Sequence, residues 1–379
     1  MKNTFSLIAL ITALASCNSS HTQKINFDTK TIAVGKGAAS VEIADFNKDG
    51  KPDIAIANTE DSSITVLLNT GNREFIQAIG SPFYAGHFPN DINIADFNKD
   101  GNPDIALANH EKKYLTVLLG NGKGQFSPTP HSPVAVQVKP HTHGIISSDF
   151  NGDGNLDIAT DSWAVDSIVV LSGDGKGNFI NPVYYATGKH PYQRLRAADF
   201  NRDNKPDIVT TNLDANTVTV LLGDGKGAFS THFFDAGNIP FGVAVGDLNN
   251  DANVDLAVIN APTISGGKPG VDGLTVLLGD GKGNFSPLKG SPFTTGLGPT
   301  RVAIGDLNND GINDIAVTNY NSNFISIYYM GKNGMLSSSQ IPFSKSADGI
   351  AIFDIDGDGK NDIVATSSVE NNVVILFGK

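Results

Sequence analysis

Cysteine is almost absent from this chain of 379 residues, since Cys17 is the only one. No disulfide can therefore form within one chain, and stability must come from packing and from bound metal. The apolar run at residues 5–14 is too short to cross a bilayer as a mature helix. Basic residues are also scarce, with 27 Lys and Arg against 39 Asp and Glu and a net charge of −12. This balance excludes nucleic acid as an expected partner.

Enzyme signatures are missing as well. The sequence has no nucleophile elbow, no paired-acid signature and no HExxH motif. Glycine-rich turns such as residues 120–126 are no phosphate loops, because no helix is expected after them. An enzymatic function would therefore have to rest on a pocket that the fold assembles from distant residues.

What the chain does contain is a nine-residue motif, first written Asp-Phe-Asn-Lys-Asp-Gly-Lys-Pro-Asp at residues 45–53. A repeat with a period near 50 residues decides the architecture before any single motif does. Oxygen-bearing side chains stand at positions one, three, five and nine of each copy, and glycine usually stands at position six. The seven copies are residues 45–53, 96–104, 149–157, 199–207, 247–255, 306–314 and 354–362.

These loops have the chemistry of calcium sites. A hard dication takes six to eight oxygen ligands, and glycine lets a loop bend back around the ion. An EF-hand would need a Glu at position twelve, but the first copy has Ile56 there, so position nine must complete the coordination instead. The expected ligands of up to seven calcium ions are Asp45, Asn47, Asp49, Asp53, Asp96, Asn98, Asp100, Asp104, Asp149, Asn151, Asp153, Asp157, Asp199, Asn201, Asp203, Asp207, Asp247, Asn249, Asp251, Asp255, Asp306, Asn308, Asp310, Asp314, Asp354, Asp356, Asp358 and Asp362.

An alternative is that the loops are metal-free turns stabilised by Asp and Asn side chains. Seven copies with at least three carboxylates each would then repel one another internally without a cation, which favours calcium. Position six is Asn204 in the fourth copy and Ala252 in the fifth. Because alanine adopts the left-handed conformation only at a cost, we expect the fifth site to be weak or empty.

The repeats predict an all-β, seven-bladed β-propeller over residues 27–379. Each unit has a strand before the aspartate-rich loop, a strand after it, a third strand and, after a glycine-rich hairpin turn, a fourth. The seventh unit ends after three strands at Lys379, while an orphan strand precedes the first unit at residues 27–34. We therefore expect the N-terminal strand to complete the last blade and close the ring.

The N-terminal residues indicate export. A basic start and an apolar run predict a signal peptide over residues 1–16. The sequence Leu-Ala-Ser-Cys ending at Cys17 resembles the lipobox of bacterial lipoproteins, which implies a lipid on Cys17 and a tether over residues 17–26. An ordinary secretory signal with a chance cysteine is the alternative. The expected location is the bacterial envelope, and Asn18 fits the outer membrane by resemblance to enterobacterial sorting rules.

Taken together, the aspartate-rich motif and the turn Thr-Val-Leu-Leu-Gly-Asp-Gly-Lys-Gly-x-Phe resemble the FG-GAP or VCBS repeats, which also form the propeller of integrin α subunits. The resemblance covers residues 27–379. It implies calcium loops on one face of the disc and ligand binding on the opposite face. The family includes adhesion modules, lectin-like binders and accessory domains of enzymes, so it does not by itself define a function.

Loops of the opposite face differ from blade to blade, as a specific site requires. They include a long insertion at residues 261–273. Four histidines at equivalent positions of blades two to four should converge near the axis. The candidate ligand-binding residues are His87, His141, His143, Trp163, His190, Tyr192, Arg194 and Arg301.

These residues leave three interpretations open: solvent-facing loop residues, a pocket for an anionic or sugar ligand, or a transition-metal site that uses His141 and His143. We expect a monomeric, calcium-stabilised binding module for a glycan or protein ligand, attached to the membrane only through its lipid. An enzyme such as a polysaccharide lyase with a His and Arg pocket, or a structural partner in an envelope complex, is the alternative.

Overall fold

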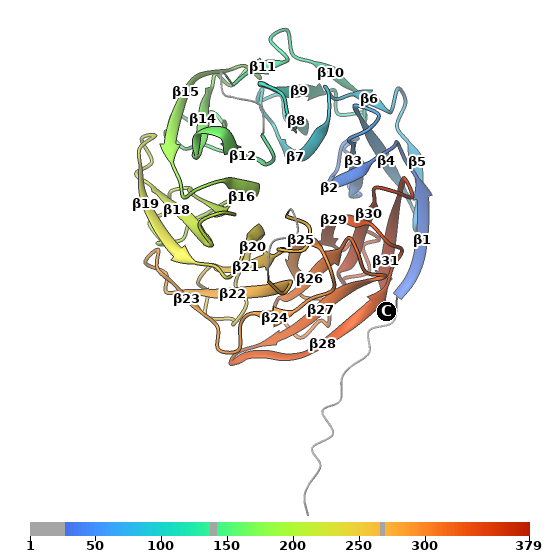
Figure 1. The fold of residues 1–379 in the computed structure, drawn as a ribbon. Coiled ribbons are helices and arrows are strands. Elements are labelled where there is room, and N and C mark those ends of the chain that lie inside the picture. Colours follow the sequence, from blue (N-terminus) through green and yellow to red (C-terminus); the bar gives the residue numbers. More distant parts are fainter. Residues whose placement is uncertain (1–26, 137–141, 266–269) are drawn as a thin grey trace, which may run out of the picture.

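The computed structural model describes residues 27–136, 142–265 and 270–379. Seven antiparallel sheets, called blades 1 to 7 here, stand around a central axis and form a ring (Figure 1). Within each blade the strands run from the axis to the rim in chain order, apart from the strand that closes blade 7. The predicted all-β, seven-bladed propeller is confirmed. One short 3-10 helix, η1 (Trp163–Val165), lies in a loop of blade 3.

The first four blades follow the repeat copies in order. Blade 1 contains β2 (Ala38–Ala44), β3 (Asp53–Asn58), β4 (Ser63–Gly71), β5 (Glu74–Gln77) and β6 (Phe83–Tyr84), and blade 2 contains β7 (Pro89–Ala95), β8 (Asp104–Asn109), β9 (Tyr114–Gly120), β10 (Phe126–Pro128) and β11 (Val134–Ala135). Blade 3 contains β12 (Ile145–Ser148), β13 (Asp157–Ser162), β14 (Ser167–Gly173) and β15 (Phe179–Ala186), and blade 4 contains β16 (Pro191–Ala198), β17 (Asp207–Asn212), β18 (Thr217–Gly223) and β19 (Phe229–Asp235).

The last three blades close the ring. Blade 5 contains β20 (Pro240–Gly246), β21 (Asp255–Asn260), β22 (Gly273–Gly279), β23 (Phe285–Pro287) and β24 (Phe293–Thr294), and blade 6 contains β25 (Pro299–Gly305), β26 (Asp314–Asn319), β27 (Phe324–Gly331) and β28 (Gly334–Pro342). Blade 7 contains β29 (Ala347–Phe353), β30 (Asp362–Ser367) and β31 (Asn372–Gly378). Its outer strand is β1 (Phe27–Ala33), which pairs with β31 from Phe27↔Gly378 to Ala33↔Asn372, as predicted.

In blades 1, 2 and 5 the outer strand is interrupted. The two pieces, such as β5 and β6, both pair with the third strand of their blade. A Ser-Pro pair with a cis peptide bond lies between the pieces, at Ser81-Pro82, Ser132-Pro133 and Ser291-Pro292. Each serine hydroxyl accepts a hydrogen bond from a main-chain N–H of the third strand, for example from Val66 at 2.9 Å. The serine hydroxyl thus takes the place of a main-chain carbonyl that the interrupted outer strand does not present to the third strand.

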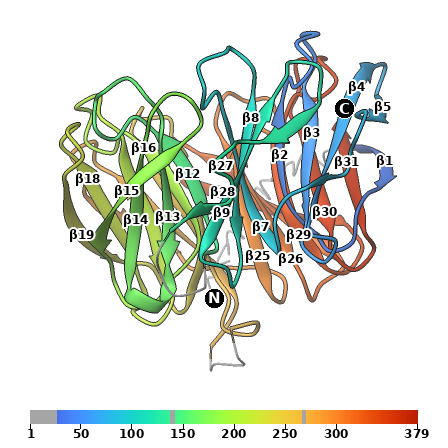
Figure 2. The same cartoon turned by 90° about the horizontal axis from the view of Figure 1, so that it is seen from above.

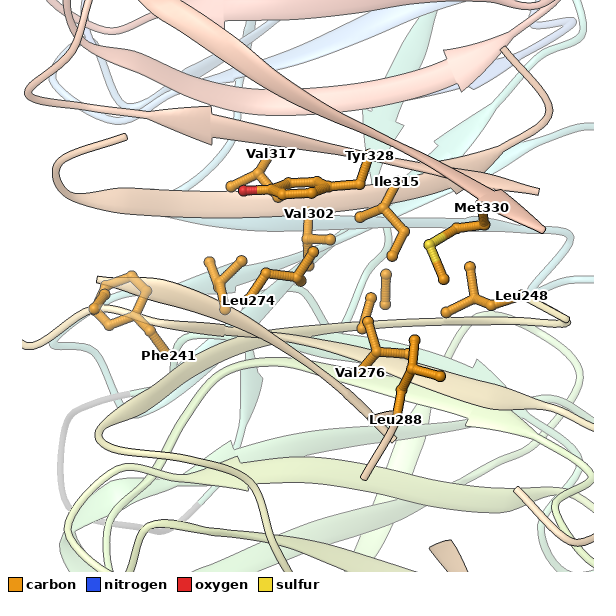
Figure 3. Packing of buried hydrophobic residues seen from close by; sticks show 14 of the residues in the cluster. Phe241, Leu248, Leu274, Val276, Leu288, Val302, Ile315, Val317, Tyr328 and Met330 are labelled. Carbon is orange, nitrogen blue, oxygen red and sulfur yellow. The ribbon is translucent and has the colours of Figure 1, made fainter. Parts of the chain in front are cut away.

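The hydrophobic core is divided into seven clusters, and each lies between two neighbouring blades. Between blades 5 and 6, Leu274 and Val276 of β22 pack against Ile315 and Val317 of β26 (Figure 3). The second strands are buried along their whole length because both of their faces are covered by adjacent blades. The apolar surface that stabilises the fold is therefore removed from water only when the blades assemble into the ring.

The topology separates two kinds of loop. The aspartate-rich loops join the first and second strands of each blade, and the loops that join the second and third strands lie at the other end of the second strand. Antiparallel pairing therefore places them on opposite faces of the disc. In Figure 2, residues 261–265 and 270–272 of the connection between β21 and β22 lie on the face of the loops that join second and third strands.

Candidate functional site

The aspartate-rich loops share one hydrogen-bonding pattern. In the first, the carboxylate of Asp45 accepts the N–H of Asp49 at 3.1 Å and the N–H of Gly50 at 2.8 Å. Asn47 accepts the N–H of Asp49 at 3.0 Å, and Asp49 accepts the N–H of Lys51 at 2.9 Å. The loop is thus held by side-chain turns, and each of these oxygens keeps a second lone pair for a cation.

The aspartate at position nine is buried and connects three parts of its blade. Asp53 is fully buried and accepts the N–H of Phe46 at 2.9 Å and that of Asn69 at 2.7 Å. Burial, together with the nearby charges of Asp49 and Asp45, raises its pKa to about 6 despite these two bonds. The same causes raise the pKa of the equivalent carboxyls. It is about 7 for Asp314 and about 6 for Asp104, Asp207, Asp255 and Asp362. The pKa of Asp157 is also raised.

The seventh loop has the tightest acidic cluster. One oxygen each from Asp354, Asp356 and Asp362 lies within 4.8 Å of the others, the only such grouping of three His, Cys, Asp or Glu residues in the described ranges. An all-oxygen set of this kind suits a hard cation such as calcium. Arg73 of blade 1 already contacts the cluster, with its Nε 2.7 Å from Asp356 and its Nη2 3.8 Å from Asp358. The residues fit a calcium ion, which would share Asp356 with this guanidinium.

On the opposite face, aromatic and histidine side chains line a cavity of about 440 Å³, which we call the aromatic pocket. Tyr192 lies at its centre, with ring centroids 4.2 Å from His143, 5.6 Å from His190 and 5.0 Å from Phe241. Trp163 lies 4.4 Å from His190. The residues lining the pocket are His110, His143, Trp163, His190, Tyr192, Leu213, Asp214, Phe241, Ile264 and Ser265. They come from blades 2 to 5.

Carboxylates orient two of the pocket histidines. His143 is 2% exposed, and its Nδ1 lies 2.9 Å from Oδ2 of the fully buried Asp161. The other oxygen of Asp161 accepts the N–H groups of His143 at 2.8 Å and Gly144 at 2.6 Å. His190 forms a similar pair with Asp214 at 2.9 Å. Because a carboxylate only accepts, each Nδ1 carries the proton in this pairing and a neutral ring has its lone pair on Nε2.

The structure brings together four of the eight predicted ligand-binding residues, namely His143, Trp163, His190 and Tyr192. His87 does not line the pocket. It is exposed and contacts Ser62 Oγ at 3.2 Å. His141 lies outside the described residues. The aromatic pocket contains no cluster of three metal-ligating groups in the described ranges, so it offers no preformed transition-metal site there.

The two predicted arginines are buried nearer the axis. Arg194 is 4% exposed and Arg301 is 3% exposed, and neither lines the aromatic pocket. Arg194 Nη2 lies 3.5 Å from Asp91, and Nη1 lies 3.7 Å from Glu42. Arg194 and Glu42 also border an axial cavity of about 540 Å³ between the innermost strands. Arg194 thus joins three blades across the axis.

Several residues that line the pocket or orient its histidines were missed by the sequence-based prediction. Asp161 lies in β13 at the position that is Ala57 in β3 and Ala108 in β8. The other second strands have an apolar residue or Thr there. An acidic residue at this one position was therefore a sequence signal for a special role of Asp161. Phe241 gave no such signal, because apolar residues are expected throughout the repeats, while Ile264 lies in the long insertion that was predicted to lie on this face. Only the relative placement of blades 4 and 5 brings them to the pocket.

The predicted signal peptide, tether and lipidated Cys17 lie outside the described residues. Within the described ranges, no helix combines the length and apolar character needed to cross a membrane.

The fold and its loops define a propeller built from aspartate-rich repeats. Models of the FG-GAP-like repeat match residues 45–107, 96–160, 149–210, 199–258, 264–317 and 306–365. The chain belongs to this repeat family. It is also 29% identical over 154 residues to integrin alpha-4 of Xenopus laevis, a match that covers 35% of this chain and 15% of the length of that relative.

Solved structures with the same fold have diverse functions. A lectin of Agrocybe aegerita, described as recognising non-reducing terminal N-acetylglucosamine, has a TM-score of 0.58 and 17% identity over 84% of this chain and 90% of its own. A streptogramin B lyase has a TM-score of 0.59 and 15% identity over 93% and 98%. Hydrazine synthase of Kuenenia stuttgartiensis has a TM-score of 0.61 and 11% identity over 91% and 96%. At these identities the likeness establishes the fold alone.

Proposed function

We propose that this protein is a calcium-stabilised binding module of the bacterial envelope that recognises a glycan in the aromatic pocket. The observation that carries the proposal is the group of rings that contact Tyr192 edge-on or tilted, with Trp163 beside His190. Aromatic faces pack against the apolar faces of sugar rings, while polar groups such as Asp214 and the histidines select hydroxyl positions. The lectin with the same fold supports a glycan, and the integrin relative keeps a protein ligand as the alternative.

A glycan array with soluble protein starting at residue 18 tests this proposal. Trp163→Ala should weaken binding of any glycan found by about tenfold, equivalent to about 1.4 kcal/mol, because it removes one stacking surface. Phe353→Ala removes an exposed ring that directly precedes the seventh aspartate-rich loop on the other face, and it should leave binding unchanged. If binding is lost in the Phe353 variant and kept in the Trp163 variant, the ligand binds on the face of the aspartate-rich loops and the proposal is wrong.

Calcium bound in the aspartate-rich loops and a lipid on Cys17 complete the proposal. The loops would hold the scaffold, and the lipid would anchor it to the envelope, with the outer membrane as its expected location. Cys17→Ser should abolish incorporation of labelled palmitate in cells. Equal labelling of wild type and variant would disprove the anchor.

A second candidate is an enzyme of the lyase type, favoured by the buried pair of His143 and Asp161. A histidine oriented by a carboxylate can act as a general base through Nε2. Release of unsaturated products from polyuronides, abolished in His143→Ala, would support this candidate over simple binding. Binding without turnover would support the first proposal.

A further inference from the structure

Three junctions between blades follow an interrupted outer strand, and the chain covers two of them with its own tyrosines. Between blades 5 and 6, Tyr328 donates its hydroxyl to the main-chain oxygen of Thr294 at 2.7 Å, and its ring lies 6.4 Å from that of Phe293. Tyr328 is 2% exposed and lies beside Val317 in the core (Figure 3). Between blades 2 and 3, Tyr184 donates to the main-chain oxygen of Val136 at 3.3 Å.

The junction between blades 1 and 2 has a smaller residue at the position of Tyr328. Leu118 pairs with Ile105 just as Tyr328 pairs with Ile315, so the two residues are equivalent in the repeat. Phe83 and Tyr84 of β6 correspond in the same way to Phe293 and Thr294 of β24. The wall that Tyr328 packs against is therefore present here, but the tyrosine is not.

The second covering tyrosine has no counterpart at this junction either. Tyr184 pairs with Val169 in the continuous outer strand of blade 3. In blade 2 the residue equivalent to Val169 is Thr116, which lies opposite the interruption between β10 and β11, so no outer-strand residue pairs with it. Among the described blades, only this junction joins two interrupted outer strands in sequence.

A cavity of about 330 Å³ opens at this point, and we call it the rim pocket. Its lining includes Phe83, Tyr84, Tyr114, Leu118, Phe126 and Pro133. An apolar cavity of about 150 Å³ is enough to bind benzene. The rim pocket therefore has room for an aromatic ring with its substituents.

We propose that the rim pocket binds the phenolic ring of a tyrosine presented by a partner polypeptide. The ring would pack between Phe83 and Leu118, and its hydroxyl would donate to the main-chain oxygen of Tyr84, as Tyr328 does to that of Thr294. This site is on the rim, away from the aromatic pocket, and its existence does not depend on the proposed function.

The surroundings favour a polypeptide over a free phenol. Ile76, Ile79, Tyr84 and Phe88, which belong to the outer part of blade 1 and the loop after it, are 56%, 78%, 72% and 41% exposed. These four exposed apolar side chains lie within one short segment, residues 76–88, which suits an interaction surface, and tyrosine is a frequent anchor residue in protein interfaces. Residues flanking the bound tyrosine would cover these side chains, which a small molecule in the pocket would leave in water.

Titration calorimetry with p-cresol, the isolated tyrosine side chain, tests the ring site. Wild type should bind one equivalent, toluene should bind several-fold more weakly because it lacks the hydroxyl, and Leu118→Tyr should reduce p-cresol affinity at least tenfold. Leu118→Phe provides a second plug if the first variant folds poorly. Tyr328→Leu is the matched gain-of-site variant and should add a second equivalent. Equal binding to wild type and to both Leu118 variants would overturn the proposal.

Peptide display tests the partner. Peptides selected on wild type and counter-selected on Leu118→Tyr should be enriched in tyrosine, and they should compete with p-cresol. If p-cresol binds but no tyrosine peptide competes with it, the pocket takes a free phenol and the polypeptide proposal is wrong. If peptides with phenylalanine in place of tyrosine bind equally well, the proposed hydrogen bond to Tyr84 is wrong.

Discussion

At the residue scale, position six of each aspartate-rich loop adopts a left-handed backbone conformation. In the fifth loop this residue is Ala252, with φ of 67°, and its N–H still donates to Asp247 at 2.8 Å. The loop geometry is therefore kept although alanine is strained in this region. Whether the strained loop binds calcium more weakly, as the sequence suggests, stays a prediction.

Relief of this strain can be measured. Ala252→Gly should stabilise the protein by about 1 kcal/mol, because glycine adopts the left-handed conformation without steric cost. Gly50→Ala is the matched control, since a Cβ at Gly50 would meet no atom within 4 Å and only the backbone conformation penalises it. It should destabilise by a similar amount. Urea unfolding that gives no opposite shifts would contradict this account.

Arg194 shows where residue-level prediction fails. The sequence placed it in a loop on the face opposite the calcium loops, but it lies in β16, where the pairing with β17 shifts register between Tyr192 and Arg196. Its φ of 72° is also left-handed. A bulge changes the direction of the following side chains. The usual alternation of side chains between the two faces of a strand therefore could not predict that Tyr192 lines the pocket while Arg194 points toward the axis.

The axial position of Arg194 predicts an effect on stability. Asp91 is 1% exposed, and Arg194→Met would leave it without this cation, at a cost of about 3 kcal/mol. Combining Arg194→Met with Asp91→Asn should recover part of the loss, because the unpaired buried charge is then removed. Urea unfolding of the single and double variants measures both effects. Additive losses would show that the two side chains do not interact.

At the scale of elements, the two repeated motifs bind each other across blades. Gly124, in the hairpin turn of blade 2, donates its N–H to the oxygen of Phe46 in the first aspartate-rich loop at 3.0 Å. Gly177 and Gly227 make the same contact with the preceding blades. The sequence predicted the strands and turns from these motifs, since both motifs recur from blade to blade. It did not predict the interrupted outer strands, although Ser-Pro pairs such as Ser81-Pro82 mark them.

The position-nine aspartates predict an unusual pH dependence in EDTA-treated protein. Burial raises the pKa of Asp53 to about 6 and that of Asp314 to about 7, both above their ordinary values near 4. The folded state therefore binds more protons than the unfolded state between about pH 4 and 7. Its stability should be highest at the acidic end of this window and fall as pH rises through 6 to 7. Thermal melts in EDTA that become more stable over this range would contradict the prediction, and saturating calcium should remove the decline.

At the scale of the whole molecule, the ring makes stability a shared property. Each hydrophobic cluster belongs to two blades, and β1 joins the two ends of the described chain across blade 7. Arg73 strengthens this closure, since it contacts Asp28 of β1 and Asp356 of the seventh loop and lies 4.5 Å from the ring of Phe377. Ring closure was predictable from the strand count. The last repeat has three strands and one further strand precedes the first repeat, so pairing that strand with the last repeat completes every blade.

Calcium should therefore stabilise all blades together. Metal that binds the folded loops and not the unfolded chain adds about 2.7 kcal/mol per site when its free concentration is a hundred times the dissociation constant. Millimolar calcium should raise the melting temperature well above its value in EDTA, in one cooperative transition, because no blade can bury its core alone. Magnesium at equal concentration is the control and should raise it less, since it prefers stricter octahedral geometry and keeps its waters. Identical melting curves in EDTA and calcium would show that the hydrogen bonds of the side chains alone stabilise the loops. The repulsion between the carboxylates around Asp53 would then be relieved by a bound proton and not by a metal ion.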